Sequence, residues 1–577
     1  MANKKSRRKR NRAKAWLLVL AILILIAVIV AAIMIITRLA PAGEVTDLEY
    51  YYNLKINAME NRDAASADEL AIVLEDEILS ERAFRNGDDV YISHSIVQER
   101  IDDRFYYDSN EGLLIVTNAL QTITAGLDNS YYNVDGQQVT MDHPAVTMRK
   151  DNVYIAADFA CEYSNASFEV FEDPSRIVIN YKTGQKTFCD TLKDTQIRVL
   201  GGVKSEIVGR VKKGEKLLVI DDLEDWLKVV SSEGWLGYVQ TSSVGTPYKE
   251  DITGDYNEPE YTSLRMTGPV KLAWNAVYSE AANDNYSSVT ERCGTAINVY
   301  CPTWYRLEDT DGTVSKISDE YYVDRAHEDG YSVWAMFSDE DYDRVEYVLT
   351  RTSLRLSIID EVINDILEKG IDGINIDFER IMSAYGSDFI QFIRELSIRC
   401  RKEGLYLSVD NYTPYEYNAC YHIEEQSRLC DYVIIMAYDD YLGTGEIGPN
   451  SSLAFIREAL DLSVSKVEES KLVAALPFYS RFWTKASDGT LSRTEYTMSN
   501  AWNLLDQVGV NAEWDQETGL YYASYETGSE EITGWLEDAD TIQAKLDLVT
   551  GSYDLGGFAF WQLGQEFGYV WDVIALY

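Results

Sequence analysis

A short segment around Asp377 carries residue types that could perform acid–base chemistry. It reads GIDGINIDFER from Gly370 to Arg380. In an extended strand every second side chain shares a face, so Asn375, Asp377 and Glu379 should point the same way. Buried carboxyls are costly without partners or a function, and a carboxyl beside another one tends to keep its proton. A protonated Glu379 could act as a general acid, although a polar cluster satisfied by its neighbours would show the same pattern.

The elements that must hold this segment alternate between strands and helices over residues 262–577. Eight apolar stretches have the length of strands: VKLAWNAVY, AINVYCPTW, YSVWAMFS, GINIDFE, LYLSVDNY, DYVIIMAYD, KLVAALPFY and GGFAFWQLG. Between them lie stretches of helical periodicity such as SLRLSIIDEVINDILEKG, which Gly370 ends. Eight strands with crossover helices predict a C-terminal (β/α)8 TIM barrel with its chemistry at the C-terminal strand ends.

An open, doubly wound sheet is the alternative fold, but no phosphate-type glycine loop follows the first strand. The seventh connection, residues 477–555, is long and contains strand-like pieces of its own. We therefore expect an insertion between strands 7 and 8. On this interpretation Asn375, Asp377 and Glu379 face the barrel axis, and Glu379 lies at the catalytic end.

The N-terminus predicts a membrane anchor. Residues 16–37 contain no charge and follow a basic run within residues 1–15. As a helix they would span about 33 Å, enough to cross a hydrocarbon core of about 30 Å. The positive-inside rule predicts a cytoplasmic tail over 1–15, a single transmembrane helix over 16–38 and an extracellular remainder. The alternative is a cleaved signal peptide, since Ala40-Pro41-Ala42 weakly resembles a cleavage site.

Two further regions lie between the anchor and the barrel. Residues 39–190 alternate apolar and polar residues between turn signals and predict a mixed α+β stalk domain. Residues 191–247 predict a small all-β barrel, because short strands recur with glycine turns between them. A polar linker should follow over 246–261. Three residues of the small barrel could form an aromatic surface: Trp226, Trp235 and Tyr238. Alternatively, Trp226 and Tyr238 simply fill its core.

Charge and cysteine content narrow the function classes. The net charge is -43, which repels phosphate backbones and argues against a nucleic-acid partner. The four histidines are far apart in sequence and no C-x-x-C motif occurs, so we expect no metal and no cofactor. Seven cysteines are an odd number; they are expected as buried thiols or with one pair, Cys161 with Cys189.

Five stretches of the predicted barrel together resemble a known enzyme family. DGINIDFE matches a D-G-x-D-x-D-x-E signature, DYVIIMAYDD an M-x-Y-D strand and GGFAFWQLGQE a closing strand with its tryptophan. These are the motifs of glycoside hydrolase family 18, the chitinase-like enzymes. PFYSRFW and ITGWLEDADTIQAKL resemble its branch of spore-cortex and wall-lytic glucosaminidases. The stalk, with NVYIAADF, resembles the copper-amine-oxidase N-terminal-like domain. The small barrel, with VKKGEKL and GWLGYV, resembles a bacterial Src-homology-3-like domain.

The family resemblance implies a substrate-assisted, retaining mechanism, in which the 2-acetamido oxygen of the substrate attacks the anomeric carbon. Glu379 would protonate the leaving oxygen and then activate water. Asp377 would hold the acetamido N–H, and Tyr438 would bind the acetamido oxygen. Further substrate-binding residues would be Asn375, Met436, Asp439 and Trp561, the last as the floor under the sugar. Two more candidates rest on their residue types alone. Arg481 could reach a carboxylate or lactyl group of the substrate or form a surface salt bridge, and Trp274 could stack on a sugar or pack in the barrel. Another four aromatic residues could stack on sugars or pack in the barrel: Trp304, Trp334, Tyr412 and Trp483.

Asn375 departs from the family pattern, which usually has an aspartate at this position. An amide cannot share a proton with Asp377, but it could donate a hydrogen bond and hold Asp377 ionised. The same asparagine is familiar in the wall-lytic branch, so we interpret it as a mark of the subfamily.

Together these features predict a membrane-anchored wall hydrolase that cleaves β-1,4 bonds next to N-acetylglucosamine. Peptidoglycan is favoured over chitin-like polymers because the catalytic domain would be tethered outside the membrane on a spacer. The expected partners are this glycan, cell-wall peptides through the small barrel, and the membrane through one helix. The alternatives are a non-catalytic glycan-binding or scaffold protein on the same barrel and a cell-surface chitinase.

Overall fold

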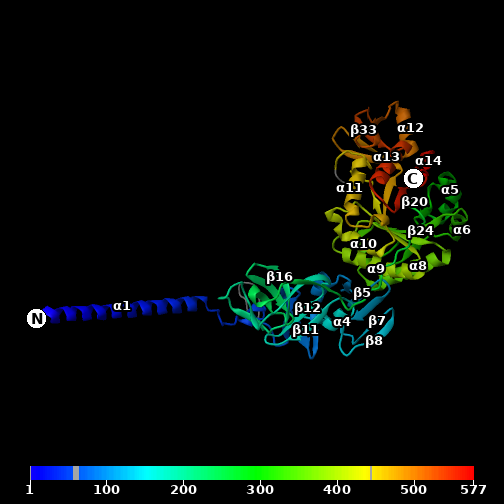
Figure 1. Ribbon diagram of the computed structural model, residues 1–577. Coiled ribbons are helices and arrows are strands. Elements are labelled where there is room, and N and C mark those ends of the chain that lie inside the picture. The colour runs from blue at the N-terminus through cyan, green and yellow to red at the C-terminus, as the bar shows by residue number, and fades with distance from the viewer. Residues whose placement is uncertain (1, 56–63, 442–444) are drawn as a thin grey trace. The chain divides into compact units, whose positions relative to one another are not determined.

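The computed structural model describes residues 2–55, 64–441 and 445–577 (Figure 1). The chain forms two compact units. The first comprises Met1–Asp103 and His143–Asn257, and the second comprises Arg104–Asp142 and Glu258–Tyr577.

The first unit begins with one long helix, α1 (Ala2–Leu39). Its segment Lys14–Arg38 has a mean hydropathy of 3.6 and none of it is buried. It is long and apolar enough to cross a membrane, and a secretion signal has the same properties. The helix therefore indicates secretion or membrane anchoring.

The first sheet of this unit has seven strands in the order β11-β12-β1-β2-β3-β10-β9. The strands are β1 (Glu69–Leu74), β2 (Glu77–Asn86), β3 (Asp89–Ser93), β9 (Val146–Arg149), β10 (Asn152–Ala156), β11 (Ser167–Phe171) and β12 (Arg176–Asn180). The short helices α2 (Leu48–Tyr51), α3 (His94–Ile96) and α4 (Ala157–Glu162) accompany them.

A second seven-stranded sheet has the order β15-β14-β18-β17-β16-β13-β19 and is antiparallel throughout. Its strands are β13 (Gly184–Asp190), β14 (Thr195–Arg198), β15 (Ile207–Val211), β16 (Lys216–Asp222), β17 (Trp226–Ser231), β18 (Leu236–Gln240) and β19 (Tyr248–Ile252). The sheet extends beyond the predicted range 191–247, because β13 pairs with both β16 and β19. The predicted linker 246–261 thus contains a strand.

Trp235 of this second sheet is engaged within its own unit. Its ring centroid lies 6.0 Å from that of Tyr52, and the guanidinium of Arg176 lies 4.0 Å from its centroid. Its indole N–H donates to Glu233 at 2.9 Å. These contacts anchor the second sheet to the residues around the first one. The predicted aromatic surface for peptides therefore does not include Trp235 as a free side chain.

The second unit contains a barrel of eight parallel strands in the described residues, as the alternating pattern predicted. They are β20 (Val270–Asn275), β21 (Val299–Pro302), β24 (Ser332–Asp339), β25 (Gly373–Phe378), β26 (Tyr406–Asn411), β27 (Tyr432–Met436), β28 (Leu472–Pro477) and β34 (Gly557–Trp561). Pairing of β20 with β34 and of β21 with β24 closes the ring. A hairpin, β22 (Tyr305–Leu307) and β23 (Val314–Lys316), joins beside β24.

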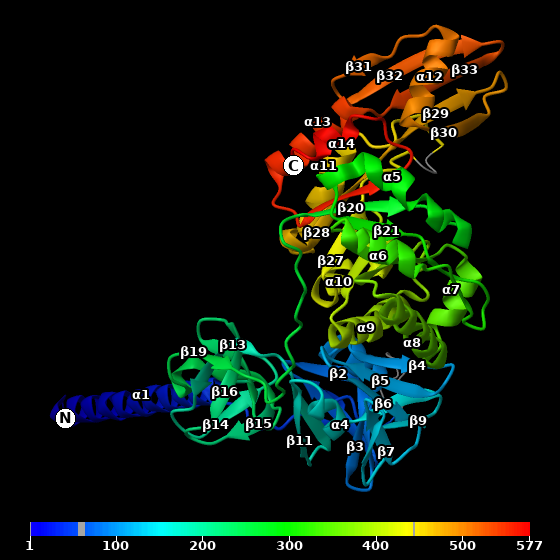
Figure 2. The ribbon, with the colours of Figure 1, turned by 90° about the vertical axis from the view of Figure 1, so that its right-hand side faces the viewer.

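Helices surround these strands (Figure 2). They are α5 (Tyr286–Cys293), α6 (Glu320–Glu328), α7 (Tyr342–Leu349), α8 (Thr352–Lys369), α9 (Gly386–Glu403), α10 (Ile423–Leu429), α11 (Leu453–Val464), α13 (Ala539–Ser552) and α14 (Val570–Ile574). The outward side chains Ile374, Ile376 and Phe378 of β25 lie in the core between strands and helices. The alternation of β25 therefore sends its polar side chains inward, as predicted.

The connection from β28 to β34 forms a separate five-stranded antiparallel sheet in the order β30-β29-β33-β32-β31. Its elements are β29 (Tyr479–Lys485), β30 (Leu491–Thr497), α12 (Met498–Val508), β31 (Glu513–Asp515), β32 (Leu520–Thr527) and β33 (Glu530–Leu536). It occupies the position where the sequence predicted an insertion.

A second addition to the barrel comes from residues predicted to belong to the stalk. The sheet β4 (Phe105–Asp108), β5 (Leu113–Thr117), β6 (Thr122–Gly126), β7 (Tyr131–Val134) and β8 (Gln137–Thr140) belongs to the second unit. Asp108 accepts hydrogen bonds from the backbone N–H and hydroxyl of Thr352, both at 2.7 Å, at the start of α8. Tyr106 donates to Asp388 of α9 at 2.5 Å. The predicted stalk 39–190 is thus divided between the two units, because these polar contacts bind its middle part to the barrel helices.

Candidate active site

Two neighbouring strands line up the polar side chains of the site. In the parallel pair β25 and β26, Asn375 lies opposite Ser408 and Ile376 opposite Val409. Continuing this register places Asp377 opposite Asp410 and Glu379 opposite Tyr412. Since side chains alternate along each strand, both rows of polar groups face the barrel interior.

Asn375 is fully buried and uses its whole amide in hydrogen bonds. Its Oδ1 accepts from the indole N–H of Trp274 at 3.0 Å. Its Nδ2 donates to Ser408 Oγ at 3.0 Å and to Asp410 Oδ1 at 2.8 Å. An indole N–H can only donate, which fixes the orientation of the amide. We expected Asn375 to donate to Asp377; that expectation was wrong, because both of its N–H bonds are used elsewhere.

Three carboxyls gather at this place, and all of them have raised pKa values. Burial raises the pKa of Asp377 well above its usual range, and the charges of Asp410 and Glu379 raise it further. Burial likewise raises the pKa of Asp410, against the hydrogen bond from Asn375. Burial also raises the pKa of Glu379. The cluster therefore favours protonated carboxyls, as a general acid requires.

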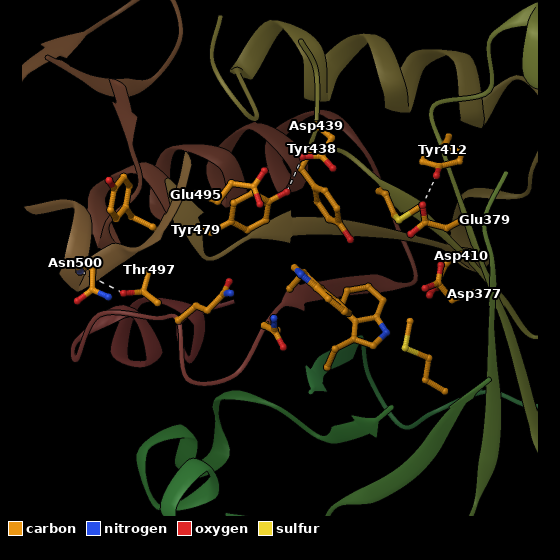
Figure 3. A pocket seen from close by; sticks show the side chains of 17 residues that line it. Asp377, Glu379, Asp410, Tyr412, Tyr438, Asp439, Tyr479, Glu495, Thr497 and Asn500 are labelled. Atoms are coloured by element: carbon orange, nitrogen blue, oxygen red, sulfur yellow. Dashed lines mark hydrogen bonds between the residues drawn. The ribbon is translucent and has the colours of Figure 1, made fainter. Parts of the chain in front are cut away.

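Glu379 follows the end of β25 and is held from the neighbouring strand. The hydroxyl of Tyr412 donates to its Oε2 (Figure 3). Its backbone N–H donates to the carbonyl of Asp339 at 3.0 Å. This hydrogen bond from Tyr412 favours the ionised carboxylate and partly opposes the effect of burial on the pKa.

The cluster opens into a cavity of about 420 Å³ (Figure 3). The cavity is lined by barrel residues and by residues of the insertion: Trp274, Met336, Asp377, Glu379, Asp410, Tyr412, Met436, Tyr438, Asp439, Tyr479, Glu495, Tyr496, Thr497, Asn500, Trp561, Gln562 and Gln565. A second cavity of about 620 Å³ shares four residues with the first: Met336, Asp377, Glu379 and Trp561. Glu379 therefore stands where two halves of a groove meet.

Tyr438 projects into the first cavity beside the carboxyls (Figure 3). Burial raises the pKa of its hydroxyl well above the usual range, and nearby Tyr479 and Asp410 add to the effect. The hydroxyl thus remains a hydrogen-bond donor at any ordinary pH. Within the part of the chain that the structure describes, no hydrogen bond of this hydroxyl to protein is present, so it can serve a ligand.

Asp439 and Arg481 form an ion pair next to Tyr438. Tyr479 donates to Asp439 Oδ1 at 2.7 Å, and Arg481 forms an ion pair with the same carboxylate. Arg481 also pairs with Glu495 at 3.0 Å. Its side chain is fully buried and does not line either cavity. Of the two roles that the sequence allows for Arg481, a contact with substrate or a salt bridge, the structure shows ion pairs with Asp439 and Glu495, and the arginine is buried rather than on the surface.

The predicted tryptophans have different positions. Trp561 lines both cavities and is partly exposed, whereas Trp274 is only 1% exposed and lies 5.8 Å from it between ring centroids. Trp274 therefore contributes mainly the hydrogen bond to Asn375. Three more are packed against protein: Trp304 donates to Asn283, Trp334 stacks on Tyr406 and Tyr432, and Trp483 donates to the carbonyl of Gly448.

The structure also bears on the cysteines and on possible metal ligands. All seven cysteines are free, so the pairing of Cys161 with Cys189 is not formed. Among the described residues no cluster of three or more His, Cys, Asp or Glu side chains suits a metal ion.

Sequence reasoning missed Asp410 and assigned Tyr412 only a possible stacking role. A signal was present, because LYLSVDNY repeats the alternation of GINIDFE with Ser408, Asp410 and Tyr412 on one face. It also missed the part of the insertion that reaches the cavity, including Glu495 and Asn500. No local pattern points to those two residues.

Comparison with known families agrees with this geometry. Residues 325–566 match the family "Glycosyl hydrolases family 18", and residues 75–179 match the "Copper amine oxidase N-terminal domain". The chain carries a family 18 glycosyl hydrolase domain. That domain contains Asp377, Glu379, Asp410 and Tyr438, and it confirms the prediction of a glycosidase.

The family 18 region has relatives among known proteins. The chain is 23% identical over 328 residues to the uncharacterized glycosylase YvbX of Bacillus subtilis (strain 168), covering 53% of this chain and 92% of that protein. It is 25% identical over 256 residues to the cortical fragment-lytic enzyme of the same organism, covering 41% of this chain and 56% of that protein. The chain thus spans nearly all of the first relative and just over half of the second.

Solved structures with similar folds include the chitinase from Chromobacterium violaceum ATCC 12472, with a TM-score of 0.48 and 22% identity over 54% of this chain and 99% of that one. The Bacillus cereus spore cortex-lytic enzyme SleL has a TM-score of 0.48 and 18% identity over 56% of this chain and 76% of that one.

Proposed function

We propose that this glycosidase hydrolyses β-1,4 bonds next to N-acetylglucosamine in peptidoglycan, by substrate-assisted retaining catalysis. One observation carries the proposal: Glu379, Asp377 and Tyr438 line one cavity, and burial raises the pKa of the Glu379 carboxyl. A carboxyl with a raised pKa keeps its proton to higher pH, and cleavage of a glycosidic bond needs such a proton for the leaving oxygen.

Each group has one task in the first step. Glu379 gives its proton to the leaving oxygen as the bond from that oxygen to the anomeric carbon breaks. The acetamido oxygen of the substrate forms the new bond to the same carbon from the other face. Tyr438 donates a hydrogen bond to the acetamido oxygen and orients it, and Asp377 accepts the acetamido N–H and faces the positive oxazolinium.

The second step regenerates the enzyme. The Glu379 carboxylate takes a proton from water, whose oxygen attacks the anomeric carbon and displaces the acetamido oxygen. Two displacements at one carbon retain its configuration. Trp561 offers the apolar face on which the sugar ring stacks, with Met436 and Asp439 in the same subsite. Arg481 holds Asp439 in place.

The groove supports a polymeric substrate. Tyr438 and Met436 line only the cavity of about 420 Å³, so the sugar with the reacting acetamido group lies there. Because both cavities meet at Glu379, the leaving part of the chain lies in the cavity of about 620 Å³. Cleavage then occurs within a bound glycan at the junction.

Peptidoglycan is preferred to chitin on two grounds. The relatives include a cortical fragment-lytic enzyme, and the apolar helix α1 indicates secretion or anchoring. We infer a single-pass protein of the cell membrane with its N-terminus in the cytoplasm and the catalytic domain outside. The half-buried Trp226 and Tyr238 remain candidates for contact with cell-wall peptides.

The test is reducing-end release from purified peptidoglycan and from chitin oligomers by wild type, Glu379→Gln and the control Glu328→Gln. Glu328 is an exposed residue of α6 outside the groove. We expect activity in wild type and control and a loss of at least about 100-fold in Glu379→Gln. Mass spectrometry of the products identifies the bond that is cleaved.

Release of no reducing ends by wild type, or equal release by Glu379→Gln, would leave the non-catalytic glycan-binding protein as the better interpretation. A higher rate on chitin than on wall would favour the cell-surface chitinase.

A further inference from the structure

Asp410 occupies a position that the mechanism so far does not use. It lies on β26 with 3% exposure and lines the same cavity as Asp377. The register of β25 and β26 places it across from Asp377, one rung beyond Ile376 and Val409. Adjacent strands are about 4.8 Å apart, so two inward carboxyls on the same rung face each other closely.

Asn375 orients Asp410 and leaves Asp377 without an amide partner. Its Nδ2 donates to Asp410 Oδ1 at 2.8 Å, which favours the ionised form of that carboxyl. In the described part of the chain, the second oxygen of Asp410 makes no hydrogen bond. It is thus available to accept a proton from a neighbouring group.

Among the described residues no cation acts on Asp377 or Asp410 themselves; Arg380 acts on Glu379 instead. Six charged or titratable groups act on Asp377 or Asp410 or are acted on by them: Glu379 after β25, Tyr412 after β26, Tyr421 at the end of the turn Glu416–Tyr421, Cys301 on β21, Tyr438 after β27 and Glu340 after β24. All are acidic groups. Two carboxyls facing each other in such a place hold one proton between them, since both cannot ionise without a large electrostatic cost.

We propose that Asp410 is the proton partner of Asp377 and supplies, from the neighbouring strand, the carboxyl that Asn375 cannot provide. At rest Asp377 carries the shared proton and Asp410 is ionised. As the acetamido group reacts, the proton passes from Asp377 to the free oxygen of Asp410. Asp377 becomes the carboxylate that accepts the acetamido N–H, and the proton returns after hydrolysis. No other reactant is required.

Asp410 is on this basis a positioning residue, because it acts on the substrate only through Asp377. The inference rests on the proposed function for its role in catalysis. The shared proton itself does not, and it can be tested without substrate.

The kinetic test compares Asp410→Asn with the exchanged variant Asn375→Asp/Asp410→Asn, which moves the carboxyl back to β25. Asp410→Asn should lower kcat about 100-fold with little change in KM. The acidic limb of its kcat profile should disappear or move, because in wild type that limb reports protonation of the accepting carboxyl. The kcat of the exchanged variant should be at least tenfold higher than that of Asp410→Asn.

A matched control is Asp431→Asn. Asp431, just before β27, is also a buried carboxyl with a raised pKa, but the hydrogen bonds to its carboxyl within the described residues come from the backbone N–H groups of Leu264 and Leu407. Its loss should reduce stability and leave the pH profile of the folded enzyme unchanged. Wild-type kcat and an unchanged acidic limb in Asp410→Asn, or no recovery in the exchanged variant, would overturn the proposal.

An infrared measurement keeps the inference testable if Asp410→Asn does not fold, or if the chain proves inactive on glycans. In Glu379→Gln the acid itself is absent, so a protonated carboxyl band at pH 7 must come from the Asp377–Asp410 pair or another buried acid. We expect such a band, and its loss on Asn substitution of Asp377. Absence of the band would refute the shared proton, whereas failure of wild type to cleave glycans would refute only the proposed function.

Discussion

The hydroxyl of Tyr412 donates a hydrogen bond to the carboxyl of Glu379, across two adjacent barrel strands. The contact continues the pairing of β25 with β26, in which the inward polar residues of the two strands lie opposite each other. A residue 33 positions away in the chain therefore lowers the pKa of Glu379 against the larger, raising effect of burial. Substitution of this tyrosine should therefore change the pH dependence of catalysis more than it changes substrate binding.

Tyr412→Phe should shift the pH–rate profile toward higher pH. The hydrogen bond from Tyr412 lowers the pKa of Glu379 against the raising effect of burial, so its removal raises that pKa. The acid then keeps its proton to higher pH, and the basic limb of kcat/KM moves up. Tyr417→Phe, at an exposed tyrosine, serves as control. A basic limb that stays in place or moves down would contradict the role given to Tyr412.

Arg481→Met should weaken both stability and substrate binding. Arg481 is fully buried and holds Asp439 and Glu495, two partly exposed carboxylates. Loss of these charged hydrogen bonds should cost about 1.5–3 kcal/mol of unfolding free energy. The KM should rise because Asp439 and Glu495 line the cavity. Urea denaturation and steady-state kinetics measure both, with Arg457→Met, at an exposed arginine of α11 that lines neither cavity, as the comparison. An unchanged KM would show that Asp439 keeps its place without the arginine.

Arg355→Met should destabilise the second unit and spare the chemistry. Arg355 and Glu395 form an ion pair with side chains 0% and 1% exposed, and neither residue lines the two cavities. Removing one partner of a buried pair leaves an uncompensated charge and costs about 3–5 kcal/mol. Lys316→Met, which removes a half-exposed pair with Glu361, should cost less than about 1 kcal/mol. Equal losses in the two variants, measured by urea denaturation, would argue against this ranking.

Glu425 should contribute stability that depends on pH. Burial acts to raise its pKa, but Arg394 and Arg428 outweigh burial and hold the pKa below its ordinary value of 4.5. A carboxyl with a lowered folded-state pKa stabilises the fold above its unfolded pKa, and this stability is lost as the pH falls through the folded value. The difference in unfolding free energy between wild type and Glu425→Gln should thus be full above pH 5 and shrink below about 4.5. A difference that grows toward acid pH would have the wrong sign.

The strand-and-helix pattern of the second unit was readable from the sequence. Ile374, Ile376 and Phe378 alternate with Asn375, Asp377 and Glu379, and this period of two determines which side chains face the axis. The stop at Gly370 and the helical run before it likewise depend only on neighbouring residues. For that reason the barrel and the inward direction of Asn375 and Asp377 could be predicted, whereas the role of Tyr438 was inferred only from the family resemblance.

Contacts between segments that are remote in the chain could not be predicted from the sequence. The pairing of Asn375 with Asp410, the hydrogen bond from Tyr412 and the burial of Arg481 behind Asp439 depend on strand register and on how the insertion folds back. The attachment of residues 104–142 to α8 and α9 is of the same kind. Local sequence determined the period of each element and hence its inward face. Only tertiary packing decided which inward groups meet, because register between parallel strands is set by the crossover helices and the core beneath them rather than by the strands themselves.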